Sequence, residues 1–140
     1  MDRRTRAREL AMQGLFQIDV QGSELLDRLL NFFRENESDD MIIQLAMKWT
    51  KDTWASVVRC DELITGSTLK WKISRLSPVD KSILRLSVYH LAFCDDIPEK
   101  VVINEAIELA KKYSTEKSPG FINGVLDAIK KKLESAKEVE

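Results

Sequence analysis

Residues 77–93 read SPVDKSILRLSVYHLAF, and this stretch decides the fold that the sequence predicts. It opens with a serine and a proline, an N-cap hydroxyl followed by the residue best suited to the first helical position, and Asp80 stands at N3. At about 100° per residue, apolar side chains cover almost the whole circumference, and only Lys81 and Arg85 form a strip for solvent. We therefore predict a helix at the centre of a helical bundle.

Two further helices follow, and each begins near one of the remaining prolines, Pro98 and Pro119. The first is a typical amphipathic surface helix with the stripe Ile103, Ala106, Ile107, Ala110 and Tyr113. The second has the stripe Ile122, Val125, Leu126, Ile129 and Leu133. Phe121 lies about a quarter-turn from that stripe, so we expect its ring at the margin of the core. Gly124 costs about 1 kcal/mol relative to alanine inside a helix, and either close helix packing or close approach of a binding partner would explain it.

The chain begins with a helix predicted over residues 3–18, whose first turns are strongly basic. Its apolar stripe is Ala7, Leu10, Ala11, Gly14, Leu15 and Ile18, and its arginines are Arg3, Arg4, Arg6 and Arg8. Cations are unfavourable at a helix N-terminus, because the dipole already places about half a positive charge there. An anionic partner would relieve this repulsion.

Phe16 falls nearly opposite the apolar stripe of this first helix, beside Met12 and Arg8. One interpretation is that the helix is buried on two sides, as bundle helices often are. The other is a face of arginine and aromatic side chains, which binds nucleic acid through phosphate contacts and through stacking worth about 1–3 kcal/mol per base.

The remaining segments also favour helices. We predict a turn over residues 19–24, a short helix over 25–33, a polar connection over 34–40, a long helical pattern over 42–64 that stops at Gly66, and a helical turn over 69–76. Extended period-2 alternation is absent, so the prediction is all-α, with six or seven helices packed as two small bundles that share a core. We expect one domain over residues 1–140, with subdomains of about 1–68 and 69–134 and a short charged tail over 135–140.

Composition limits the possible functions. The 140 residues include 22 basic and 23 acidic side chains, so net charge alone gives no sign of nucleic-acid binding. The sequence lacks the apolar run of about 20 residues that a membrane span requires, and we expect a soluble, cytoplasmic protein with Cys60 and Cys94 as free thiols.

A catalytic or metal site is not expected. His90 and Cys94 stand four residues apart, but both are predicted to face apolar neighbours, where a thiol is not activated. The sequence has no zinc-ligand set and no phosphate-binding loop, so we expect neither enzymatic activity nor a cofactor. The acids Glu105, Glu108 and Asp127 are predicted on solvent faces.

Four separated motifs resemble the NusB transcription antitermination family. They read RRTRARE (residues 3–9), WKISRLSPVDKSILRL (71–86), IPEKVVINEAIELAKKY (97–113) and FINGVLD (121–127). The resemblance implies transcription regulation through binding of boxA, a single-stranded RNA element, together with NusE, a ribosomal small-subunit protein, in an antitermination complex with RNA polymerase. The family usually has an acid where this chain has His90. Whether the free protein is a monomer or a homodimer stays open.

The resemblance and the helical wheels together give a candidate RNA-binding set: Arg3, Arg4, Arg6, Arg8, Phe16, Asp80, Lys111, Lys112, Lys117 and Phe121. The two aromatics match family positions near the RNA surface and also lie off the core stripes, so we expect them to form one surface with the arginines. For Asp80, an RNA contact would compete with its role at the start of a helix. The alternatives are a solvated terminus on a protein-only adaptor, or an RNA-binding module related to the N-terminal domain of ribosomal RNA methyltransferases.

Overall fold

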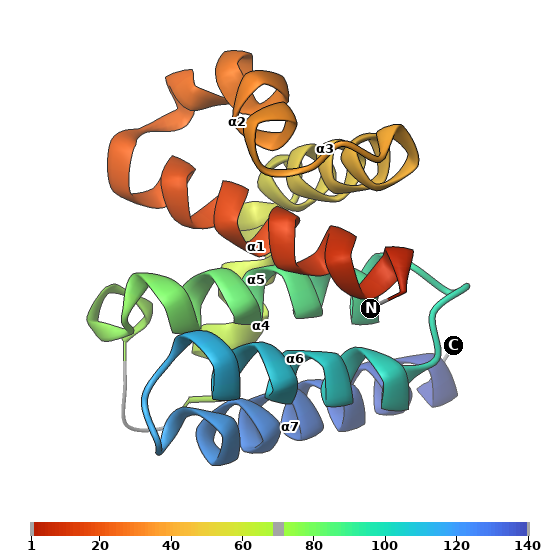
Figure 1. Cartoon of the computed structure of the whole chain (residues 1–140). Helices are drawn as coiled ribbons and strands as arrows, with labels where there is room; N and C mark the ends of the chain where they lie inside the picture. The colour runs from red at the N-terminus through yellow and green to blue at the C-terminus, as the bar shows by residue number, and fades with distance from the viewer. Residues whose placement is uncertain (1, 69–71, 140) are drawn as a thin grey trace.

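The computed structural model describes residues 2–68 and 72–139, and that part of the chain is built from helices (Figure 1). The α-helices are α1 (Arg3–Gln21), α2 (Leu29–Asn36), α3 (Asp40–Ala55), α4 (Val57–Thr65), α5 (Pro78–Phe93), α6 (Glu99–Tyr113) and α7 (Ser118–Val139). Two 3-10 helices, η1 (Ser23–Arg28) and η2 (Ile73–Arg75), connect them. The described residues contain no strand, which confirms the all-α prediction. Of the turn predicted over 69–76, residues 69–71 lie outside the described residues.

Helix α5 is the centre of the molecule, as its nearly continuous apolar surface predicts. It packs against α1, α3, α4, α6 and α7, and every residue from Ser82 to His90 is buried. Figure 1 shows α1 beside α5 in the middle, with α2 and α3 on one side of this pair and α6 and α7 on the other. The Ser77 hydroxyl accepts a hydrogen bond from the backbone N–H of Asp80 (3.1 Å), so the predicted start signal forms.

The prediction that Arg85 faces solvent is wrong. Its guanidinium donates to both carboxylate oxygens of Asp61 on α4 (2.8 Å each) and to Asp19 on α1 (3.1 Å). It also lies over the ring of Trp54 at 5.7 Å from the ring centre. Because all of its charge is compensated, a buried arginine can tie three helices together. Lys81 pairs with the same Asp19 (3.2 Å) and is likewise mostly buried.

Two predicted helices are each divided in the structure. The pattern over residues 42–64 is interrupted at Ser56, whose backbone N–H donates to the carbonyls of Asp52 and Thr53. The Ser56 hydroxyl bonds to the same two carbonyls, an alternative to the helical ladder that serine side chains can supply. The helix predicted over 25–33 is η1 followed by α2. At the other end of the chain, α7 continues through the expected tail to Val139.

Candidate nucleic-acid interface

Helix α1 begins at an N-cap, Asp2, that is not among the residues predicted from the sequence. The carboxylate of Asp2 accepts a hydrogen bond from the backbone N–H of Thr5 (2.8 Å), and this bond lowers the pKa of Asp2. A carboxylate at this end also reduces the repulsion between the helix dipole and the nearby arginines. The arginines of the first two turns therefore project from a helix with a fixed start.

Arg3 and Arg4 are the exposed members of the arginine group. Their side chains are 60% and 52% exposed, and each has one surface partner: Asp39 lies 3.0 Å from Arg3, and Asp96 lies 3.4 Å from Arg4. The hydrogen bond from Arg3 lowers the pKa of Asp39. Ion pairs of this kind contribute at most about 1 kcal/mol, so a phosphate could replace either carboxylate.

Arg6 is engaged mainly within the protein. Its guanidinium contacts Glu37 (3.0 Å), the carbonyl of Asn36 (2.8 Å) and Glu9, which ties α1 to the end of α2. Its side chain is 24% exposed. Arg6 therefore has less freedom than Arg3 or Arg4 to meet a ligand.

Arg8 is buried, and the structure gives it no surface from which to reach RNA. Its guanidinium lies over the ring of Trp49 (5.3 Å to the ring centre) and 3.4 Å from Glu105 on α6, and its side chain is 5% exposed. Burial lowers the pKa of Arg8, while the carboxylate of Glu105 acts in the opposite direction. We therefore assign Arg8 to the core and correct the expectation of an RNA contact.

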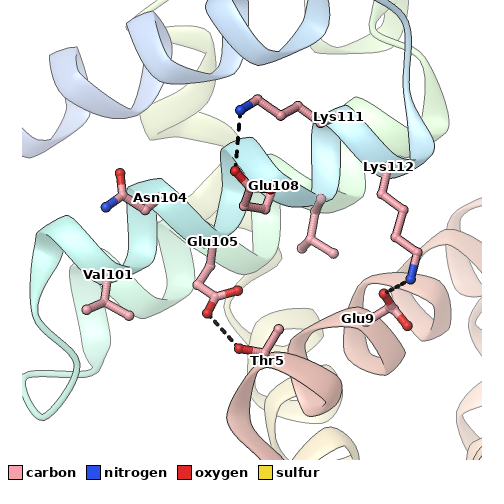
Figure 2. A pocket seen from close by; sticks show the side chains of 9 residues that line it. Thr5, Glu9, Val101, Asn104, Glu105, Glu108, Lys111 and Lys112 are labelled. Carbon is pink, nitrogen blue, oxygen red and sulfur yellow. Dashed lines mark hydrogen bonds and ion pairs between the residues drawn. The ribbon is translucent and has the colours of Figure 1, made fainter. Parts of the chain in front are cut away.

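An open groove of about 630 Å³ lies between the first half of α1 and α6 (Figure 2). Thr5 and Glu9 line it from α1, and Lys111 and Lys112 line it from the last turn of α6. Lys112 donates to Glu9 (2.7 Å), which keeps one lysine over the groove. Although burial alone raises the pKa of Glu9, hydrogen bonds from Lys112 and other donors bring it below its usual value. Both predicted lysines are exposed.

A second, smaller hollow of about 320 Å³ joins three of the predicted RNA-binding residues: Asp80, Lys117 and Phe121. Lys117 is exposed, and the ring of Phe121 packs against the core at its margin, as predicted. The Asp80 carboxylate accepts hydrogen bonds from the hydroxyls of Ser114 (2.6 Å) and Ser118 (3.0 Å). These bonds tie the start of α5 to the turn between α6 and α7 and fix the shape of the hollow.

The directions of α1 and α6 determine where the groove and the Phe121 hollow lie relative to the arginines. Helices α1 and α6 run parallel, since Thr5 contacts Glu105, and Gln13 donates to the Tyr113 hydroxyl (3.1 Å). The 19 residues of α1 span about 28 Å at 1.5 Å per residue. Arg3 and Arg4 stand at the start of α1, whereas the Phe121 hollow lies at the turn between α6 and α7, beyond the end of α6 that the second half of α1 contacts. The exposed arginines and the Phe121 hollow are therefore two separate clusters, in place of the expected single patch.

The NusB family model matches residues 5–131. The chain belongs to the NusB family. A NusB transcription antitermination protein from Bacillus licheniformis is 46% identical over 134 residues, which cover 96% of this chain and 100% of that relative. The resemblance found in the sequence is therefore confirmed.

Solved NusB structures share the fold. Thermotoga maritima NusB has a TM-score of 0.79 and 36% identity, and the match covers 94% of this chain and 92% of that one. The NusB chain crystallised with NusE and double-stranded RNA has a TM-score of 0.81 and 30% identity, covering 94% and 98%. These neighbours confirm the NusB fold.

Phe16 is half-buried in this NusB family member, whereas Met12 and Arg8 on the same side of α1 are buried. The interpretation that α1 is covered on two sides is thus correct for Met12 and Arg8. The ring of Phe16 lies in the second half of α1, away from Arg3 and Arg4. A contact between Phe16 and RNA stays a prediction.

His90 and Cys94 do not form an activated pair. The His90 ring packs edge-on against Trp49 (4.5 Å between ring centres), and burial lowers its pKa to about 3, which keeps the imidazole neutral. Burial raises the pKa of Cys94, and both cysteines are free thiols, as expected. Within residues 2–68 and 72–139, no group of three or more possible metal ligands was found, and no helix is long and apolar enough to cross a bilayer.

Sequence reasoning missed three residues that shape the interface: Asp2, Thr5 and Arg75. Asp2 could have been found, because an acid three residues before Thr5 is an N-cap signal. Arg75 is exposed and lines the Phe121 hollow, but nothing in its local sequence distinguishes it from other surface arginines. Thr5 matters through a contact with Glu105, which only the packing of α1 on α6 reveals.

Proposed function

We propose that this NusB family member acts in transcription antitermination by binding boxA-type single-stranded RNA together with NusE. The observation that carries the proposal is the exposure of two groups of cations: Arg3 and Arg4 at the start of α1, and Lys111 and Lys112 in the groove that the next turns of α1 form with α6. Exposed cations at separate points of one surface match the repeated phosphates of a nucleic-acid strand.

Phosphates of the RNA strand would replace surface carboxylates as the partners of the arginines. Arg3 and Arg4 release Asp39 and Asp96, and each exchange is favourable because a weak exposed ion pair gives way to a contact that releases counterions from RNA. Lys111 has a comparably exposed partner in Glu108 at 3.4 Å. This part of the interface supplies affinity without reading sequence.

Base recognition would occur at the Phe121 hollow. The half-exposed ring provides a stacking surface, and Lys117 supplies a cation for the adjoining phosphate. Each Asp80 oxygen accepts one serine hydroxyl and keeps a lone pair that an amino group of a base could use. The hollow, of about 320 Å³, has room for a base, which fits recognition of an unpaired nucleotide.

A second subunit fits this arrangement because the protein alone has little attraction for RNA. Its net charge is −1, and each of its four N-terminal arginines already faces a carboxylate. A partner that adds phosphate contacts raises the affinity of the pair well above that of either protein. NusE is the partner that the solved NusB complex with RNA contains, and RNA polymerase would be reached through the assembled complex.

The experiment is a titration of a boxA-like single-stranded RNA at two salt concentrations, with the protein alone, with NusE alone and with both. Arg4→Ala is compared with Arg59→Ala, because Arg59 has the same kind of exposed pair at the same 3.4 Å on the distant helix α4. We expect Arg4→Ala to reduce the slope of log affinity against log salt by about 0.7, the value for one phosphate of a single strand. Arg59→Ala should leave the slope unchanged.

The possible outcomes distinguish the alternatives. Equal effects of the two substitutions would reject the arginine site. RNA binding that is absent with and without NusE, while NusE still binds, would identify a protein-only adaptor. A duplex of the same sequence, titrated in parallel, shows whether unpaired bases are required.

A further inference from the structure

Glu105 of α6 makes contacts that its predicted solvent position does not explain. One of its oxygens, Oε1, accepts a hydrogen bond from the Thr5 hydroxyl (2.7 Å) and lies 3.4 Å from the Arg8 guanidinium. Its side chain is 21% exposed. A single carboxylate thus joins α6 to the first turn of α1 through Thr5, which is 100 residues away in sequence (Figure 2), and to the second turn through Arg8.

A carboxylate at this position is unfavourable for RNA if only its charge is considered. Glu105 lines the groove between α1 and α6, where the proposed strand would pass. Glu108 lines the same groove, but its side chain is 69% exposed and its partner is the equally exposed Lys111. The two acids therefore carry the same charge in the same groove, but Glu105 contacts α1 and Glu108 contacts a lysine of its own helix.

Two features of α1 make the Glu105 contact important for the arginines. The first is that Arg8 is buried beside Trp49 and one of its nitrogens, Nε, has no hydrogen-bond partner among the described residues, so Glu105 supplies the carboxylate that compensates this charge. The second is that the first turn of α1 carries cations at the positive end of the helix dipole, which favours fraying. A cap by Asp2 alone holds the helix start but not its position against α6.

We propose that Glu105 is a positioning residue for RNA binding, which holds the first two turns of α1 against α6 and so keeps Arg3 and Arg4 directed outward. This inference rests on the proposed function. Loss of Glu105 removes a negative charge from the RNA-binding face and yet weakens RNA binding, because the arginines are no longer held in place. This role of Glu105 requires no contact with the RNA.

The test compares Glu105→Gln with Glu108→Gln, two substitutions that remove the same charge from one groove. RNA affinity and its salt dependence are measured for both, with NusE present. We expect Glu108→Gln to bind as tightly as wild type or slightly tighter, since one repulsive charge is gone. We expect Glu105→Gln to bind about tenfold more weakly, the scale of one lost charge-assisted contact, and to show a shallower salt slope.

Substitution of Thr5 provides a second test of the Glu105 contact, one that leaves the charge of the groove unchanged. Thr5→Val removes the hydroxyl that donates to Glu105 and should weaken RNA binding, whereas Thr5→Ser keeps a hydroxyl and should restore it. Hydrogen exchange of the backbone amides of residues 6–9, measured without RNA, should be faster in Glu105→Gln and Thr5→Val than in Glu108→Gln.

The results separate failure of this inference from failure of the proposed function. If wild type and all variants fail to bind RNA, the proposed function is wrong. If wild type binds and Glu105→Gln matches Glu108→Gln in affinity, salt slope and exchange, the positioning role is wrong. A lower melting temperature with unchanged affinity below that temperature would also overturn it, because a purely stabilising residue behaves in that way.

Discussion

Replacement of Gly124 by alanine should stabilise the protein. Gly124 lies inside α7, and a methyl group added at its Cα would meet no atom of another described segment within 4 Å, so close helix packing does not explain this glycine. Glycine is less favourable than alanine in a helix interior by about 0.8–1 kcal/mol, and nothing in the surroundings opposes this gain. For a chain of 140 residues, we expect the melting temperature to rise by about 3 °C.

The assay is urea unfolding followed by circular dichroism, with thermal melting as a second measurement. The matched control is Gly14→Ala in α1, where an added methyl would lie 3.0 Å from Phe33 and 3.2 Å from Leu29, both buried. Overpacking of this kind costs about 1–3 kcal/mol, so Gly14→Ala should be less stable than wild type. Unchanged or reduced stability of Gly124→Ala would refute the reasoning and would mean that this side of α7 is covered in solution.

Three further predictions follow from buried groups and from the second hollow. Arg85→Ala should lower the free energy of unfolding by about 3–5 kcal/mol in urea titrations, because it leaves Asp61 without its cation and Asp19 with Lys81 alone. Because the folded pKa of His90 is about 3 and the unfolded value is about 6.5, the unfolded chain binds the proton first, and stability falls as pH drops below 6.5. The loss at pH 5 is about 2 kcal/mol, and His90→Gln should flatten the stability profile between pH 7 and 5. Phe121→Leu keeps an apolar side chain at the core margin but removes the stacking surface, so RNA affinity should fall by about 1–3 kcal/mol in titrations while the melting temperature changes little.

The central helix could be predicted because its signals are local. The serine cap, the proline and the apolar circumference of α5 all lie within the helix itself, and the structure reproduces them. The break at Ser56 could not be predicted in the same way, since the sequence there contains neither proline nor glycine. It depends on a serine that bonds to carbonyls three and four residues earlier, a contact that serine makes only in some helices.

The same limit applies to the candidate site. A helical wheel places Arg85 and Glu105 on a face, but it does not tell whether another helix covers that face. The partners of Arg85 are 24 and 66 residues away, and Thr5 is 100 residues from Glu105. Arg8 was assigned to the surface for the same reason. Phe121 was placed correctly, because its position relative to the stripe of its own helix decides its exposure.

The central claim is that one strand of RNA lies along the groove from the start of α1 to the Phe121 hollow. Chemical-shift mapping of the protein's backbone amides during titration with single-stranded RNA and NusE tests this claim most directly. We predict RNA-dependent shifts at Arg3, Arg4, Lys111, Lys112, Lys117 and Phe121, beyond those that NusE alone produces. Shifts confined to α2, α3 and α4, with these residues unaffected, would contradict the account.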